Sequence, residues 1–293
     1  MPAAFLPVAL LLVLVAGCDR SPMDSDDTPS SEIPSADVQP PPDQAALESP
    51  PSEFVIRDLF FDVFFASDRR ESTDRGRAFH TFTFTDMENP ERRYFQALRA
   101  INEHHLPPGE GFPPRSHAHM EILTWVIDGE LRHRDFEDRQ EIITPRRFQR
   151  INAGSRFLFS TFNPSETADA HYIEIWMRPN DFEADHRYDA VDLDPAERQG
   201  QFQKLAGPDG NEAPVEIFQD ARLFAIDLTD GQDASFAQTM DRALWIHVAT
   251  GSVQIGRYGF GPGDGLAVTG RGDVQMTALE ASQVLLVDLE RWE

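Results

Sequence analysis

The chain has 293 residues, which is enough for one large domain or two ordinary ones. It carries 50 Asp and Glu residues against 26 Lys and Arg residues, a formal net charge of -24 at pH 7. Such a chain lacks the basic footprint of a nucleic-acid-binding protein and would repel phosphates, so we expect a well-solvated surface and no nucleic-acid partner.

Residues 1–17 predict a signal peptide, because the apolar run from Phe5 to Val15 has the length of a signal h-region and is short for a bilayer span. The run ends in LVAGC, which resembles the lipobox of bacterial lipoproteins, where the cysteine is lipidated and becomes the first mature residue. We therefore expect lipidation of Cys18, the only cysteine, and no remaining thiol for a disulfide or for thiol catalysis. An ordinary cleaved signal or a tail helix is the alternative.

Residues 18–52 predict a disordered linker. Positions 19 to 52 hold eight Pro and eight acidic residues with a single Arg, a composition that cannot bury a core. Extended as polyproline II, the linker reaches roughly 100 Å. The chain is therefore expected to contact a membrane only through its lipid anchor, on the periplasmic or outer-surface side of the cell envelope.

From residue 53 onward, short β-rich runs alternate with Gly, Pro, Asn and Asp, which predicts an all-β sandwich or barrel. The runs fall into two similar groups, which predicts two copies of one small barrel, at residues 53–185 and 186–293. The polar stretch 192–214 is interpreted as the connection. Asp128-Gly129 and Thr250-Gly251 lie between β-rich runs and predict tight hairpin turns.

Four stretches carry a family resemblance: GFPPRSHAHMEILTWVIDGELRHRD, followed by INAGSRFLFSTFNPSE and HYIEIWM, and the C-terminal HVATGSVQIGRYGFGPGDGLAVTG. Together they resemble the pirin family, most closely the bacterial pirin-like proteins that include quercetin dioxygenases. The resemblance implies a bicupin, two tandem β-barrels, in which the N-terminal barrel binds one iron or similar divalent metal through three His and one Glu.

Mapped onto this sequence, the resemblance places the four family ligand positions on Arg115, His117, Phe159 and Thr161. Only His117 keeps a family ligand. The other three residues offer no strong metal ligand, and Arg115 adds a fixed positive charge where the cation would lie. We therefore expect a metal-depleted site and no cofactor.

His119 follows the expected pair by two residues. Because side chains alternate along a strand, Arg115, His117, His119 and Glu121 are expected to share one face. His117 and His119 are thus the remaining candidate metal ligands, or else polar residues at the barrel mouth. Arg115 and Glu121 are candidates for ligand binding, with Arg115 holding an anion bidentately; an ion pair from Arg115 to Glu121 or to another nearby acid is the alternative.

Five other histidines are weaker candidates. His133 and His171 are expected in the core or beside a metal ligand, without being ligands themselves, and the pair His104-His105 is expected in a polar surface loop. His247 is the only histidine after residue 186, so no metal cluster is expected in the second barrel.

Two functions compete. The first is a metal-free, pirin-like bicupin lipoprotein that binds a small anionic ligand or a protein partner at the cell envelope. The second is a metal-dependent dioxygenase of the quercetin 2,3-dioxygenase type, which needs a metal with open coordination positions. Since function lies in sites and not in folds, the replaced ligands favour the first.

Overall fold

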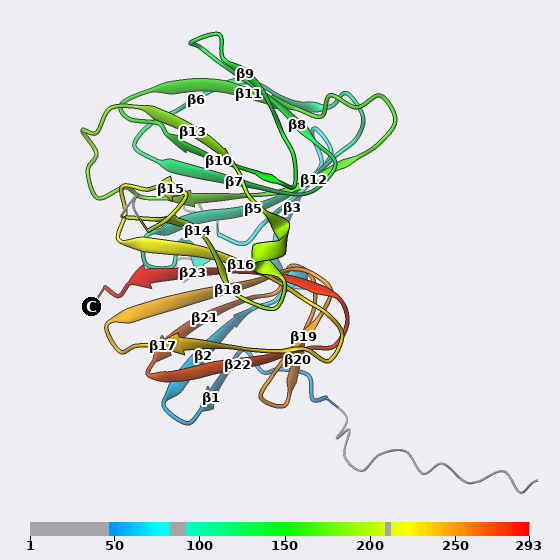
Figure 1. Ribbon diagram of the computed structural model, residues 1–293, viewed down its shortest axis with the longest axis vertical. Helices are drawn as coiled ribbons and strands as arrows, with labels where there is room; N and C mark the ends of the chain where they lie inside the picture. Colours follow the sequence, from blue (N-terminus) through cyan, green and yellow to red (C-terminus); the bar gives the residue numbers. More distant parts are fainter. Residues whose placement is uncertain (1–46, 83–91, 209–211, 293) are drawn as a thin grey trace, which may run out of the picture. The chain divides into compact units, whose positions relative to one another are not determined.

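The structure, a computed structural model, describes residues 47–82, 92–208 and 212–292 (Figure 1). The predicted signal peptide, Cys18 and positions 18–46 of the predicted linker lie outside the described residues. The described helical segments are two short 3-10 turns, η1 (Ala66–Asp68) and η3 (Pro195–Arg198). In the part of the chain that the structure describes, no helix has the length and apolar character needed to cross a membrane.

The N-terminal barrel consists of two antiparallel sheets. The larger sheet contains, in spatial order, β13 (Arg187–Asp192), β10 (Arg147–Asn152), β7 (Glu121–Asp128), β12 (Ala170–Met177), β5 (Leu98–Leu106), β4 (Arg77–His80) and β3 (Arg70–Ser72). The smaller sheet contains β6 (Gly111–His117), β11 (Phe157–Phe162), β8 (Leu131–Asp135) and β9 (Gln140–Ile143).

The C-terminal barrel repeats this plan. Its larger sheet contains β1 (Glu53–Ile56), β2 (Leu59–Phe64), β21 (Gly265–Gly270), β18 (Arg242–Thr250), β23 (Ser282–Glu290), β16 (Ala221–Leu228), β14 (Gln203–Gly207) and β15 (Val215–Glu216). Its smaller sheet contains β17 (Asp233–Gln238), β22 (Gly272–Ala278), β19 (Val253–Ile255) and β20 (Tyr258–Phe260). The all-β, two-barrel prediction is confirmed.

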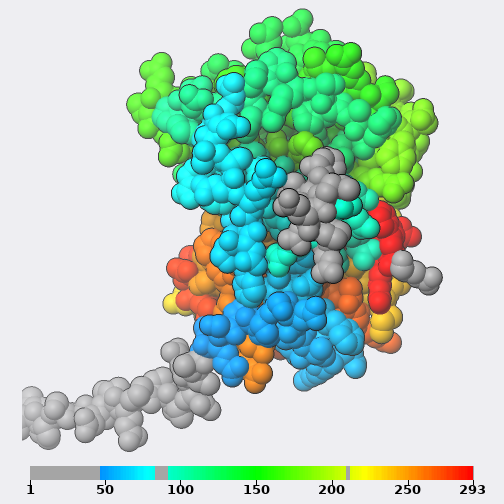
Figure 2. Space-filling view, turned by 180° about the vertical axis from the view of Figure 1, so that it is seen from behind, coloured from blue at the N-terminus to red at the C-terminus, as the bar shows by residue number. Residues whose placement is uncertain are grey.

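The order of strands along the chain does not match their division between the two barrels. β2 pairs with β21 over its whole length, so the first strands of the described chain belong to the C-terminal sheet. From there the chain passes to β3 and β4, and Figure 2 shows this blue-to-cyan segment running from one barrel to the other. The stretch interpreted as a connection contains β14, which pairs with β16.

The two predicted hairpin turns are tight, but they do not join paired strands. Gly129 and Gly251 adopt φ of 73° and 70°, as a tight turn requires. However, β7 and β8 belong to different sheets, and so do β18 and β19. The hairpin prediction is therefore wrong: each Gly turns a corner between the sheets of one barrel, and local sequence does not distinguish a corner from a hairpin.

β5 and β12 are buried on both faces. One face carries Ile173 and Ile175, which share a core with Leu285 and Val287 of the C-terminal barrel. The opposite face carries Tyr172, inside the N-terminal barrel. Polar residues on these two strands therefore belong to two separate environments.

Candidate functional site

The four residues at which the resemblance predicts the family ligands lie on the paired strands β6 and β11. Phe159 is opposite Arg115 in the register, and its ring stacks on the imidazole of His117 with the centroids 4.7 Å apart. Phe159 and Thr161 are buried. Of the four side chains, His117 alone offers a strong metal ligand, and its buried Nε2 has no hydrogen-bond partner. Burial lowers the pKa of His117. The charge of Glu174 acts in the opposite direction, and the charge of Arg115 lowers the pKa further.

His119 and Glu121 do not join His117. The strand ends at His117, and His119 adopts a left-handed φ of 54° in the turn that follows. This turn interrupts the expected alternation. His119 is exposed, with Nδ1 3.2 Å from the carbonyl oxygen of Phe182. Glu121 begins β7 and accepts hydrogen bonds from Arg150, so it does not pair with Arg115.

A cavity of about 260 Å³ lies in the N-terminal barrel beside these positions. Its polar lining includes His80, Asn102, His104 and Glu174, while Phe112 and Trp176 supply aromatic surface. Its remaining charged lining residues are Asp74, Arg75, Arg77 and Arg115. Three arginines thus face two acids in a protein that is strongly acidic as a whole. A larger hollow of about 420 Å³ lies between β2 and β22, and the described residues that line it include no histidine.

Glu174 is the buried carboxylate of this cavity. Its Oε2 accepts a hydrogen bond from Nε1 of Trp176 at 3.3 Å and lies 3.7 Å from Nε2 of His104. Burial by itself raises the pKa of Glu174, but His104 and the charges of Arg115 and His117 outweigh it, so the pKa is lowered. Glu174 is therefore ionised at neutral pH and presents an acceptor to the cavity.

The expectation for the pair His104-His105 is wrong, and the expectation for His133 is confirmed. His104 and His105 do not lie in a loop but on β5, and His104 is buried with its ring stacked on Tyr172 at 4.7 Å. The side chains of NEHHL alternate between the two faces of β5, and both faces are buried. The polar composition of this motif predicts a surface loop instead. His133 is buried as predicted, with Nε2 3.5 Å from Oδ2 of Asp135.

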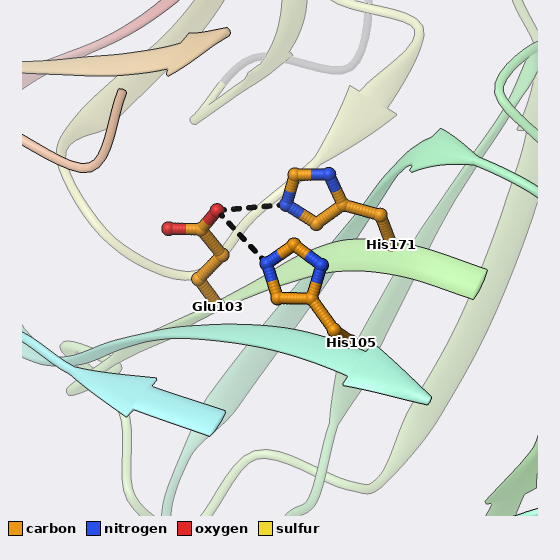
Figure 3. A group of neighbouring side chains, drawn as sticks. All are labelled: Glu103, His105 and His171. Atoms are coloured by element: carbon orange, nitrogen blue, oxygen red, sulfur yellow. Dashed lines mark hydrogen bonds and ion pairs between the residues drawn. The ribbon is translucent and has the colours of Figure 1, made fainter. Parts of the chain in front are cut away.

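A second polar cluster lies on the opposite face of β5 and β12. Figure 3 shows Glu103 with its carboxylate directed at the imidazoles of His105 and His171. Oε1 of Glu103 is 2.7 Å from Nε2 of His171 and 3.6 Å from Nε2 of His105. Oε2 of Glu103 accepts a hydrogen bond of 2.5 Å from Arg69. Sequence reasoning placed none of these three residues in a site.

Comparisons with known proteins agree with the fold. Residues 64–177 match the family described as Pirin, and residues 204–289 match the family described as Quercetinase C-terminal cupin domain. The chain is 32% identical over 227 residues to a protein of Escherichia coli K12 named quercetin 2,3-dioxygenase, which covers 75% of this chain and 97% of that protein. It is 29% identical over 224 residues to a pirin-like protein of Caulobacter vibrioides, covering 75% and 96%.

A solved structure is also similar: the bacterial pirin YhhW from Escherichia coli in complex with nickel(II). It superposes with a TM-score of 0.73 at 29% sequence identity and covers 79% of this chain and 100% of that one.

Proposed function

This chain belongs to the pirin family, and from that premise we propose that it is a bicupin whose N-terminal barrel binds a small anionic ligand in place of the family metal. One observation carries the proposal: Arg115, at a position where the resemblance predicts a metal ligand, lines the barrel cavity, and Phe159, at another such position, stacks on His117.

The side chains at the family positions do not fit a metal. A cation bound by His117 would gain no ligand from Phe159, whose ring covers the imidazole, and only a weak one from the hydroxyl of Thr161. It would also meet the guanidinium of Arg115. Oxygenase chemistry of the quercetin 2,3-dioxygenase type is therefore the weaker candidate at this position.

The cavity suits an anion with an aromatic body. The guanidinium of Arg115 lies over the ring of Phe112, 4.1 Å from the ring centroid. This cation–π contact orients the guanidinium. Such a planar fork binds a carboxylate through two charge-assisted hydrogen bonds. The rings of Phe112 and Trp176 offer apolar contact, and Glu174 accepts from a hydroxyl group. A partly open cavity of this size favours a small molecule over a protein partner.

The ligand chemistry leads to a test with 4-hydroxybenzoate as the probe, which combines a carboxylate, a ring and a hydroxyl donor. We expect calorimetry to show saturable binding that weakens about 10- to 150-fold in Arg115→Ala, because a hydrogen bond to a charged group contributes about 1.5–3 kcal/mol. The neutral 4-hydroxybenzamide is expected to bind far more weakly than the acid.

Arg146→Ala is the matched control, since Arg146 is an exposed arginine outside the cavity lining. Equal affinity of the two arginine variants would refute the assignment. So would a wild-type protein that binds none of 4-hydroxybenzoate, benzoate and inorganic phosphate.

The same proposal places the protein at the cell envelope, anchored by a lipid on Cys18. The apolar run before LVAGC and the Pro-rich segment after it support this location. In a bacterial host, the wild type is expected in the membrane fraction and Cys18→Ser in the soluble fraction or as an unprocessed precursor. Identical fractionation of both, with identical mass, would contradict lipidation.

A further inference from the structure

We propose that Glu103, His105 and His171 form a binding site for a divalent transition-metal ion, separate from the cavity of the N-terminal barrel. The three ligand atoms lie within 4.8 Å of one another. Two imidazoles and one carboxylate are a donor set that zinc and other first-row divalent metals take in proteins.

The fold brings these residues together through the pairing of β5 and β12. Glu103 and His105 are two residues apart on β5, so their side chains project from the same face. His171 is directly opposite His105 in the register of the two strands. The site is therefore built on two adjacent central strands of a sheet, which hold ligands more rigidly than loops do.

The distances are close to those of a coordinated metal. A tetrahedral ion with bonds of about 2.0–2.1 Å separates its ligand atoms by about 3.3 Å. The two gaps from Oε1 of Glu103 to the imidazole Nε2 atoms, 2.7 and 3.6 Å, lie on either side of this value. The imidazole rings stack with centroids 4.0 Å apart, and small side-chain rotations would direct both nitrogens at one ion.

The surroundings keep the carboxylate of Glu103 ionised and the neighbouring His247 uncharged. Burial opposes ionisation of Glu103, but the imidazoles of His105 and His171 beside its Oε1 and the charge of Arg69 give it a lowered pKa, so the carboxylate is ionised. Arg69 holds Oε2 and leaves Oε1 for the metal, as an outer partner orients a ligand. Complete burial lowers the pKa of His247 to about 4, so this neighbour is neutral and adds no repulsion at pH 7.

Solvent reaches the site from the side of the two histidines. The side chain of His105 is 40% exposed and that of His171 is 19% exposed, while Glu103 is buried. A metal ion can therefore enter without unfolding, and water can complete its coordination. Three protein ligands plus water describe an open metal site rather than a closed structural one.

The test is titration of the chelator-treated full-length protein with Zn²⁺ at pH 7.5, followed by calorimetry. We expect one zinc ion per chain, with affinity reduced at least about 100-fold in His105→Ala and in His171→Ala, beyond the 10–100-fold typical of outer-residue changes. Replacing Zn²⁺ with Co²⁺ should give visible absorption of a low-coordinate site that each variant abolishes. Binding should weaken as the pH is lowered, because protons compete with the metal for imidazole.

Two histidine controls make the result specific. His186→Ala removes an equally exposed imidazole that lies 3.1 Å from Glu137, and His117→Ala removes the residue at the family position. Both are expected to bind zinc as the wild type does. Zinc binding lost only in His117→Ala would overturn the proposal in favour of the family site.

Wild-type binding no stronger than that of the folded His105→Ala variant would show an ion-pair network without a metal. Since Arg115 is outside this cluster, loss of 4-hydroxybenzoate binding and loss of zinc binding are separable results.

Discussion

Replacing Arg150 with alanine is expected to lower the free energy of unfolding by about 3–5 kcal/mol, the cost of leaving a buried charge without its partner. The side chains of Arg150 and Glu121 are both fully buried. Oε1 of Glu121 accepts hydrogen bonds from Nη2 of Arg150 at 2.8 Å and from the backbone NH of Phe218 at 2.8 Å. Urea unfolding at equilibrium measures the change.

The effect is large because this pair links the two barrels. Arg150 lies on β10 and Glu121 on β7 of the N-terminal sheet, whereas Phe218 precedes β16 of the C-terminal sheet. The guanidinium also lies 4.6 Å from the centroid of the Phe218 ring and 3.2 Å from Asp189. Removal of Arg150 therefore disturbs contacts in both barrels.

Arg147→Ala is the internal comparison, since Arg147 lies on the same strand. Its two ion pairs, with Glu141 and Asp192, are partly exposed, so the expected loss is about 1 kcal/mol or less. The double variant Glu121→Met with Arg150→Met should recover most of the stability, because two apolar side chains leave no buried charge. An Arg150→Ala loss no greater than that of Arg147→Ala would contradict this account.

The position of Glu121 shows where strand alternation predicts the structure and where it does not. Alternation holds within β6, which places Arg115 and His117 on one face with Phe159. It stops at the turn containing His119, whose positive φ is uncommon for any residue with a side chain. Because the turn contains no Gly, the sequence does not predict that Glu121, at the start of β7, faces away from His117.

The same limit explains why the Glu103 cluster was not predicted. Short β-rich runs and punctuating turns suffice for an all-β, two-barrel fold. However, His171 meets His105 only through the pairing of strands 66 residues apart, which no local pattern encodes. The burial of β5 on both faces could not be predicted either, because a segment rich in Asn, Glu and His is typical of the protein surface.

Restoring the family ligands is expected to give the N-terminal barrel a metal. In the triple variant Arg115→His, Phe159→His and Thr161→Glu, the unchanged His117 completes three imidazoles and one carboxylate. Made in a His105→Ala background that silences the second cluster, this variant should hold close to one nickel ion per chain after incubation and desalting. Nickel is the probe because a similar structure holds nickel(II). Elemental mass spectrometry gives the count.

The matched control replaces the same three side chains without adding ligands: Arg115→Gln, Phe159→Leu and Thr161→Val in the same background. It removes the guanidinium and the stacked ring, so it is expected to stay below about a tenth of a metal per chain, because His117 alone cannot hold the ion. Equal metal in the two triple variants would mean that the positive charge and the ring, not the missing ligands, keep metal out. A folded ligand-restored variant without metal would mean that the backbone of β6 and β11 has diverged beyond its side chains. If the ligand-restored variant gains metal and the control does not, these three residues account for the difference from the relative whose structure holds nickel(II).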